Sequence, residues 1–428
     1  MKASKSFFTF AALLIALQQS MIHAFAQPST PRDSMWITNG TVSAVAYSKG
    51  LTYIGGDFTY VGPNTGYGAA LSTITGAPDL KFPKANGRIN IVTADGADGW
   101  YIGGQFTKVG DLTRNWIAHI KADGTVDPNW DPNPSGTLTT DPIPFYASMH
   151  IYAIVVSGST VYVSGNFTSI GGQQRRGIAA LEASTGQATS WNPHASGIVR
   201  ALALKDTTVY AGGAFELIGG QSRKYLAALD MATGNATAWN PVLNAGVNII
   251  AISDSLLVVG GFFTSAEGQA RQHLAAFDLT NSQVTAWNPN IDANIYALAI
   301  DGTTLYAGGN FTSIGGLPRE YTAALSIYSS TPLSWDPKAN GPVHAICLNG
   351  STIYAGGVFT KIGGANRHQI AALDKTTGNA TAWSSVTPAP VRGLAANTDG
   401  SIIYAGGNFG SIGGQWRNRL AALYAATG

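Results

Sequence analysis

Apolar and polar residues alternate along short segments that recur at a regular spacing through most of the chain. Residues 295–300 alternate in this way and end at Asp301-Gly302, a strong signal for a two-residue hairpin. Residues 303–311 follow as a second strand, 322–326 as a third and 333–337 as a fourth. One repeat therefore predicts four short antiparallel strands.

A glycine-rich phrase marks the second strand of each repeat, and its clearest form is YAGGNFTSIGG at residues 306–316. The phrase occurs eight times, with Ser164-Gly165 in place of one glycine pair, at intervals of 48, 61, 48, 48, 48, 48 and 50 residues. Four short strands within a constant period of this length are typical of a propeller blade. We therefore predict an all-β fold, an eight-bladed β-propeller of four-stranded antiparallel blades.

The two ends of the chain predict how such a ring closes. The eighth repeat stops at Thr427-Gly428, where its sisters continue into the fourth strand, whereas Trp36 lies in a strand-like segment before the first repeat. We expect this N-terminal strand to complete the last blade, which would leave no unpaired edge. The alternative is a fragment that has lost a ninth unit.

The first residues have the pattern of a secretory signal peptide. Two lysines precede the apolar stretch 7–17, and Ala24-Phe25-Ala26 supplies the small residues before a cleavage site. A membrane anchor needs about 20 continuous apolar residues, and polar residues 18–20 interrupt this run. We expect cleavage of residues 1–26, no membrane segment afterwards, and one domain over 27–428 in a secreted, periplasmic or cell-surface protein.

Charge and cysteine content narrow the classes of partner. The chain has 25 Lys and Arg against 23 Asp and Glu, and loss of the two leader lysines leaves 23 of each. A neutral chain has no long-range attraction for nucleic acid or an anionic membrane. Cys347 is the only cysteine and lies in an apolar run, so we expect a buried, inert thiol. Low cysteine use in an exported protein favours a bacterial source.

The recurring phrases resemble known propellers. YAGGNFTSIGG, AALD-x-x-TG and TAWNP are similar to the bacterial delta-60 repeat propellers, a group largely of unknown function, over about residues 36–428. The AALD-x-x-TG-x-x-x-x-W segment also resembles the tryptophan-docking repeat of eight-bladed quinoprotein dehydrogenases. That family binds a quinone and calcium over an acid-rich centre, whereas the innermost strands predicted here carry no acid. We therefore expect no cofactor and no metal.

Tryptophan and arginine each recur at one position of the repeat, and we interpret both as structural. The tryptophan is expected to wedge each blade against the next, because a residue that every repeat requires is a packing residue first. The arginines either form a crown that binds anions or donate to carbonyls of their own turns, and we favour the second. The positions are Trp36, Trp130, Trp191, Trp239, Trp287, Trp335 and Trp383, with Phe82 in the first repeat, and Arg114, Arg175, Arg223, Arg271, Arg319, Arg367 and Arg417.

One position varies while its surroundings do not. The second residue of each inner strand is polar throughout, although valine, isoleucine and small apolar residues flank it. Innermost strands converge near a propeller's axis, so these side chains are expected to form a rim. The rim is either a ligand site or the polar wall of a water-filled channel. Its members are Ser43, Asn90, Tyr152, Arg200, Asn248, Tyr296, His344 and Arg392.

An insertion after Trp130 is expected at the same mouth. The connection 131–150 is 13 residues longer than its counterparts and contains Phe145-Tyr146. Insertions in repeat proteins gather on the working face. We therefore predict that a ligand contacts Tyr146 together with the rim residues from Asn90 to Arg392.

No catalytic constellation is recognisable. The histidines lack metal-ligand spacing, and no Gly-x-Ser-x-Gly elbow occurs. Glu216 and Glu320 have the chemistry for glycoside cleavage, but neither has a partner near it in sequence. We therefore assign no catalytic residue and expect a monomeric, non-catalytic propeller that binds a protein or glycan. The alternative is a hydrolase or lyase acting on polysaccharide.

Overall fold

The computed structural model describes 36–38, 41–48, 51–57, 61–63, 70–71, 78–79, 83, 85–97, 99–138, 149–396, 400, 402–407, 409, 411–413, 415–416 and 420–428. The predicted signal peptide, Tyr146 and Arg417 lie outside these residues. The chain divides into two compact units, residues 1–64 and residues 65–428. Every element described is a strand. No helix in the described part is long and apolar enough to span a membrane.

In the first unit, β2 (Thr41–Ser48) and β3 (Leu51–Asp57) form an antiparallel hairpin. The strand that contains Trp36, β1 (Trp36–Thr38), pairs with β4 (Val61–Pro63) in the same unit, and Trp36 lies opposite Pro63. The structure thus gives the N-terminal strand a partner other than the last blade, and the predicted closure is not confirmed.

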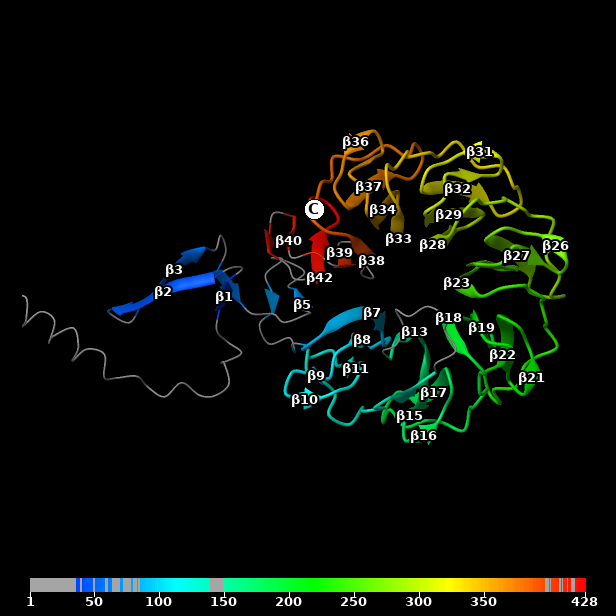
Figure 1. The fold of residues 1–428 in the computed structure, drawn as a ribbon, viewed down its shortest axis with the longest axis horizontal. Helices are drawn as coiled ribbons and strands as arrows, with labels where there is room; N and C mark the ends of the chain where they lie inside the picture. Colours follow the sequence, from blue (N-terminus) through cyan, green and yellow to red (C-terminus); the bar gives the residue numbers. More distant parts are fainter. Residues whose placement is uncertain are drawn as a thin grey trace, which may run out of the picture. The chain divides into compact units, whose positions relative to one another are not determined.

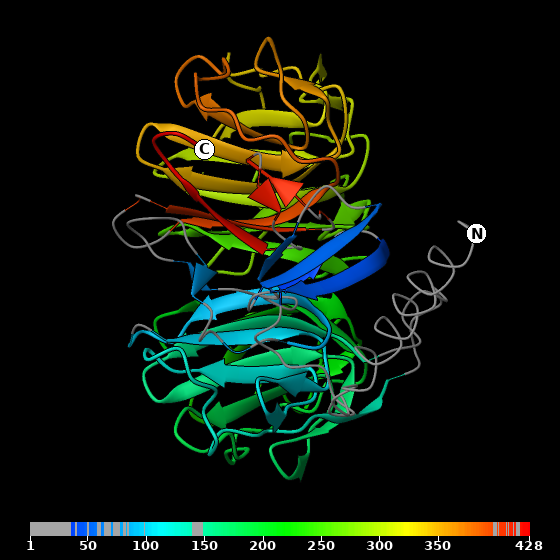
Figure 2. The ribbon, with the colours of Figure 1, turned by 90° about the vertical axis from the view of Figure 1, so that its left-hand side faces the viewer.

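The second unit is built from short antiparallel sheets that follow one another around a central axis (Figure 1). Apart from the small sheet β12–β15–β16, seven three-stranded sheets lie within its described residues, and the first strand of each of these seven lies nearest the centre. Seen from the side, their strands run from one face of this unit to the other (Figure 2). The sheets comprise β7 (Arg88–Ala94), β8 (Trp100–Gln105) and β11 (Ile117–Ile120); β13 (Ile151–Ser157), β14 (Thr160–Gly165) and β17 (Ile178–Glu182); β18 (Ile198–Lys205), β19 (Thr208–Ala214) and β22 (Leu226–Asp230); β23 (Val247–Ile252), β24 (Leu256–Gly261) and β27 (Leu274–Asp278); β28 (Ile295–Asp301), β29 (Thr304–Gly309) and β32 (Thr322–Ser326); β33 (Val343–Asn349), β34 (Thr352–Gly357) and β37 (Ile370–Asp374); β38 (Val391–Ala396), β39 (Ile402–Gly407) and β42 (Leu420–Tyr424).

Small hairpins connect the second and third strands of the sheets. Each is a pair of two-residue strands, except in the third repeat, where β15 has four residues. There β15 pairs with β16 on one side and with β12, a strand of the insertion, on the other. They are β9 (Lys108–Val109) with β10 (Leu112–Thr113), β12 (Ser135–Thr137) with β15 (Phe167–Ile170) and β16 (Gln173–Gln174), β20 (Leu217–Ile218) with β21 (Gln221–Ser222), β25 (Ser265–Ala266) with β26 (Gln269–Ala270), β30 (Ser313–Ile314) with β31 (Leu317–Pro318), β35 (Lys361–Ile362) with β36 (Ala365–Asn366), and β40 (Ser411–Ile412) with β41 (Gln415–Trp416). The first repeat adds β5 (Ala70–Leu71) paired with β6 (Pro78–Asp79).

The predicted fourth strand is largely irregular in the structure. It contributes one bridge to the third strand, such as Ala236 with Leu229, and one further backbone hydrogen bond, from Thr237 N to Ala228 O. The tryptophan follows, and in three repeats the next residues are Asn-Pro. Proline has no N–H to continue a ladder, and the indole docks on the neighbouring sheet instead. The described blades are therefore three-stranded sheets, and the first six of the seven carry a single-bridge edge.

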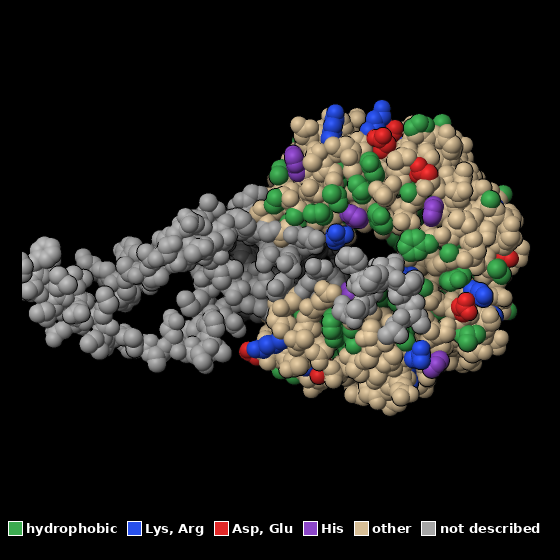
Figure 3. All heavy atoms as spheres, viewed as in Figure 1, with side chains coloured by type: hydrophobic (Ala, Val, Ile, Leu, Met, Phe, Trp, Pro, Cys, Tyr) green, Lys and Arg blue, Asp and Glu red, His purple; other side chains and the backbone are tan. Residues whose placement is uncertain are grey.

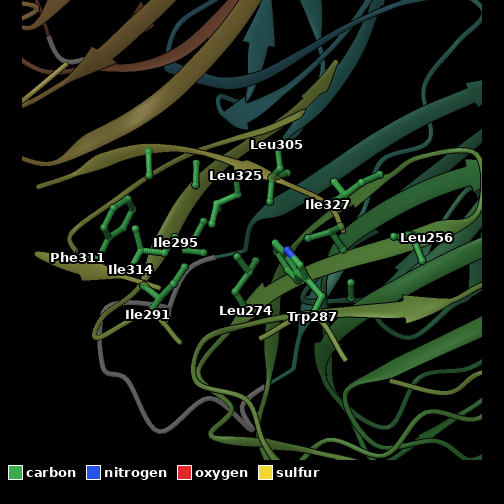
Figure 4. Close-up of a cluster of buried hydrophobic side chains, with 14 residues drawn as sticks. Leu256, Leu274, Trp287, Ile291, Ile295, Leu305, Phe311, Ile314, Leu325 and Ile327 are labelled. Carbon is green, nitrogen blue, oxygen red and sulfur yellow. The ribbon is translucent and has the colours of Figure 1, made fainter. Parts of the chain in front are cut away.

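Hydrophobic cores lie between consecutive sheets. In Figure 4, Leu274 and Trp287 from one repeat pack against Leu305 and Leu325 from the next. Trp287 is only 4% exposed, and its indole nitrogen donates to Ser326 O at 2.8 Å. The same bond to a residue 39 to 52 positions on is made by Trp130, Trp191, Trp239, Trp335 and Trp383. The interpretation of tryptophan as a wedge between blades is confirmed for these positions. Cys347 is a buried free thiol, as expected.

Candidate functional site

Each predicted rim residue is the extra residue of a β-bulge. In β18, Val199 pairs with Gly213 and Ala201 with Gly212, so Arg200 between them stands outside the ladder register. A bulge takes its extra residue out of the pairing and redirects the side chain. The same shift occurs in β2 of the first unit and in the first strand of each of the seven blade sheets, at Ser43, Asn90, Tyr152, Arg200, Asn248, Tyr296, His344 and Arg392.

The glycine pair of each second strand makes room for the bulge. A Cβ on Gly213 would collide with Ile198 O of the inner strand, and a Cβ on Gly212 would lie 2.6 Å from Val247 Cγ1 of the next sheet. The second glycine therefore admits the bulged backbone, and the first admits the neighbouring sheet. The glycine pair thus recurs in the sequence because each inner strand has a bulge beside it.

The register places the bulges at one face of the second unit. The start of β18 pairs with the end of β19, and the start of β22 pairs with the same end. First and third strands of each sheet therefore begin at a common face, which we call the rim face. Figure 3 shows a central hollow on the face it presents, with hydrophobic side chains gathered around it and Lys or Arg and His side chains at its edge.

Three consecutive inner strands bring predicted rim residues together. The rings of Tyr296 on β28 and His344 on β33 stack, with centroids 4.9 Å apart and planes 30° apart. Burial lowers the pKa of His344, and the positive charge of Arg392 on β38 lowers it further. Tyr296 is 40% exposed, and Arg392 is also exposed. We call these three residues the aromatic–arginine arc.

A second group forms where the insertion meets the rim. Tyr152 stacks on His150, the last residue of the insertion, with ring centroids 5.8 Å apart and planes 12° apart. Nε2 of His150 lies 3.1 Å from Nε2 of Gln105. His150 was not among the predicted site residues. The part of the insertion that holds Tyr146 lies outside the described residues, so its contact with a ligand stays a prediction.

The remaining rim residues are placed less fully. Arg200 extends toward the next sheet, because a Cβ on Gly246 would lie 3.7 Å from its Nη1. Asn248 is half-buried. For Ser43 and Asn90 the structure gives the bulged backbone alone.

Two further variable positions at the rim face were missed by the sequence analysis. The first is the residue after the glycine pair, which ends the second strand or directly follows it, and Phe262 and Val358 at this position are 44% and 42% exposed. The residue before the third strand has left-handed backbone in every repeat where it is described: Trp116, Gly177, Tyr225, His273, Tyr321 and Gln369. Such backbone disfavours bulky residues, so these side chains are held there at a cost in strain. Gly177 in the third repeat is the one residue at this position whose type indicates left-handed backbone from the sequence alone.

The arginines are used inside the fold. Arg223 donates from Nη1 to Ser222 O at 2.9 Å and from Nη2 to Thr237 O at 2.8 Å, which ties the turn to the segment before the tryptophan. The interpretation of these residues as turn clamps is confirmed for Arg114, Arg175, Arg223, Arg271, Arg319 and Arg367.

A buried carboxylate–imidazole–carboxylate cluster belongs to the second repeat alone. His119 lies with Nε2 2.9 Å from Asp95 Oδ2 and Nδ1 3.1 Å from Asp127 Oδ2. Burial raises the pKa of Asp95, but hydrogen bonds from His119 and from two backbone N–H groups outweigh it and leave the pKa lowered. Tyr101 stacks on His119, and burial together with the two carboxylates raises the pKa of its phenol to about 12. No group of metal-binding side chains is found among the described residues.

The two glutamates considered for glycoside chemistry lie in turns of different repeats. Glu216 precedes β20 and pairs with Lys224 at 3.7 Å, and both side chains are more than half exposed. Glu320 lies between β31 and β32 and is exposed. Neither is a bulged rim residue.

Residues 96–129 match the model of a family described as "Domain of unknown function (DUF5122) beta-propeller". The match runs from the turn after β7 to the residue before Trp130, and so covers most of the second repeat. The fold is a β-propeller. Several solved structures are similar to the chain, and no curated protein matches it.

Three of the similar structures differ widely in origin. The computationally designed protein Ika8 has a TM-score of 0.54 at 14% identity, over 92% of this chain and 97% of that one. The Pan2 WD40 domain of Neurospora crassa has a TM-score of 0.48 at 9% identity, over 74% and 86%. The extracellular domain of the one component system BT4673 from B. thetaiotaomicron has a TM-score of 0.44 at 10% identity, over 78% and 38%. At such identities the likeness concerns the fold alone.

Proposed function

We propose that this protein is an exported, non-catalytic β-propeller that binds a protein or a glycan through its rim face. The bulge at every inner strand carries the proposal. It takes one residue per repeat out of the ladder register and redirects its side chain, while the apolar residues on either side stay in the sheet.

The variation of the rim residues supports a ligand rather than a scaffold role. Positions that serve packing carry the same residue in nearly every repeat, as the tryptophans and arginines do. The bulged position instead carries serine, asparagine, tyrosine, arginine and histidine in different repeats. A wall that only contacts water needs no such differences, whereas an asymmetric ligand meets each repeat differently.

Binding is favoured over polysaccharide cleavage by the chemistry of the rim. Hydrolysis of a glycoside uses two carboxyl groups that face each other across the bond. None of the eight bulged positions is Asp or Glu. The polar groups offered are amides, phenols, imidazole and guanidinium, which bind by hydrogen bonds, stacking and charge.

We also propose that the first repeat supplies an eighth blade. Its β2–β3 hairpin has the same bulge and glycine pair as the other inner hairpins, and the period of the sequence includes it. The N-terminal strand would complete the last blade. We further propose that the chain is related to the delta-60 repeat propellers, that its source is bacterial and that it is a monomer. Export is tested by sequencing the N-terminus of the mature protein, which we expect to begin at Gln27.

The test of binding is a triple variant, Arg200→Ala, Tyr296→Ala and Arg392→Ala, screened with the parent on a glycan array and in pull-downs. A matched control replaces three exposed hairpin residues at the other ends of the strands, Asp254→Ala, Thr303→Ala and Ser351→Ala. We expect both variants to keep the parent melting temperature and the rim variant alone to lose its ligand. Equal binding by all three proteins would show that the rim only lines a channel.

A further inference from the structure

The aromatic–arginine arc combines a flat apolar surface with a positive charge. Tyr296 and His344 form a stacked pair from neighbouring sheets, and Arg392 follows on the next inner strand. Space is open beside the arginine, because a Cβ added to Gly393 would meet nothing within 4 Å. The arc is therefore accessible and partly preorganised.

Exposed apolar side chains extend this surface along the rim face. The backbone of Val358 is bonded to Pro342 O, two residues before the bulged His344. That of Phe262 is bonded to Gly246 O, two residues before the bulged Asn248. Phe262 and Val358 thus lie at the bases of β23 and β33, the inner strands on either side of β28, and at 44% and 42% exposed both remain open to a ligand.

No carboxylate competes for the guanidinium among the variable positions of this face. In residues 65–428 neither the bulged position, the position after the glycine pair nor the position before the third strand is Asp or Glu. Two acidic side chains of the intervening loops are held by other groups. Asp292 accepts from Thr312 N at 2.9 Å, and Asp336 lies 3.6 Å from Arg319.

We propose that the aromatic–arginine arc is the subsite for an acidic sugar residue, with the pyranose ring against Tyr296 and its carboxylate on Arg392. This inference rests on the proposed binding function. An arginine binds a carboxylate through two parallel hydrogen bonds. A small inorganic anion would leave the aromatic surface unused, and a flexible acidic peptide lacks a rigid apolar face next to its carboxylate. A uronic acid residue supplies both in one ring.

The test is calorimetric titration of the full protein with an oligogalacturonate and with its methyl ester, which keeps the sugar rings and removes the charge. We expect the acid to bind and the ester to bind at least about tenfold more weakly, since charge-assisted hydrogen bonds contribute about 1.5 to 3 kcal/mol and 1.4 kcal/mol is tenfold. Arg392→Gln should weaken the acid by a similar factor and leave the ester unchanged. Tyr296→Ala should weaken both ligands.

Several outcomes would overturn the inference. They are equal binding of acid and ester, an Arg392→Gln variant that binds the acid like the parent, competition by inorganic sulfate at the same concentration as the sugar, and tighter binding of poly-glutamate than of oligogalacturonate. If these occur while the triple rim variant still loses some other ligand, the binding function stands and only the acidic-sugar subsite is wrong. If the rim variant loses nothing, the binding function itself is wrong.

Discussion

Replacing Trp287 by alanine should destabilise the protein by about 4 kcal/mol. The side chain is 4% exposed and packs between the sheets that begin with β23 and β28, against Leu274, Leu305 and Leu325. Truncation of a buried tryptophan to alanine costs about 3 to 5 kcal/mol, because apolar contact is lost and a cavity remains. The variant also leaves Ser326 O and Ser329 O without the indole donor that lies 2.8 and 3.0 Å from them.

Trp287→Phe separates the two contributions. Phenylalanine retains much of the apolar area but has no N–H, so the loss should fall to about 1 to 3 kcal/mol, the usual cost of an unsatisfied buried acceptor together with a smaller cavity. The order of stability should therefore be parent, Phe, Ala.

The measurement is urea unfolding combined with hydrogen exchange. Repeats contact only their neighbours, so the loss of protection should be largest in β27 and β32 and small in β17, which is two sheets from β27 and three from β32. A loss below 1 kcal/mol for Trp287→Ala, or protection lost equally in all sheets, would refute the interpretation of the tryptophan as a wedge between two particular blades.

Three other predictions follow from the described contacts. Folding lowers the pKa of Asp95, so its ionised form stabilises the protein fully at pH values above the ordinary aspartate pKa near 4, and this stabilisation is lost as the pH falls through the folded pKa. The difference in melting temperature between the parent and Asp95→Asn should therefore shrink as the pH falls from 6 to 2. A constant difference would contradict this prediction. Gly213→Ala should destabilise the protein far more than Gly220→Ala, because a Cβ on Gly213 would collide with backbone atoms. A Cβ on Gly220 would meet nothing, and alanine at its φ of +74° costs only about 1 kcal/mol in backbone strain. Similar melting temperatures for the two variants would be inconsistent with the role of the glycine pair. If the N-terminal strand completes the last blade, deleting residues 27–40 should lower the melting temperature and expose β42 to hydrogen exchange, and unchanged protection there would rule the closure out.

Much of the architecture could be predicted from the period of the sequence. The glycine pair and the alternating inner segment repeat with the regularity of a ring of small sheets. The recurrence of tryptophan and arginine at fixed positions correctly indicated structural roles, in packing between blades and in holding turns. The fourth strand was overestimated because alternation around Trp239 resembles a strand, although Asn240-Pro241 cannot continue a ladder.

The candidate site could be predicted in position but not in mechanism. Variation against a constant background located the rim residues, yet the bulge depends on the pairing of Val199 and Ala201 with another strand, which no single segment reveals. Bulky residues with left-handed backbone, such as Tyr225, give no local signal, because glycine is the residue expected there. The cluster around His119 joins Asp95 and Asp127, which are 24 and 8 residues away, and so depends on the sheet for its assembly.

The bulge separates the identity of a side chain from the hydrogen bonding of its strand. Because Arg200 and its seven counterparts stand outside the ladder register, exchanging one for another alters no cross-strand pair and leaves its sheet's register in place. Specificity can then change one sheet at a time, by single point mutations whose effects on folding are small. A library randomised only at these positions, on an otherwise constant framework, would make the protein a programmable receptor.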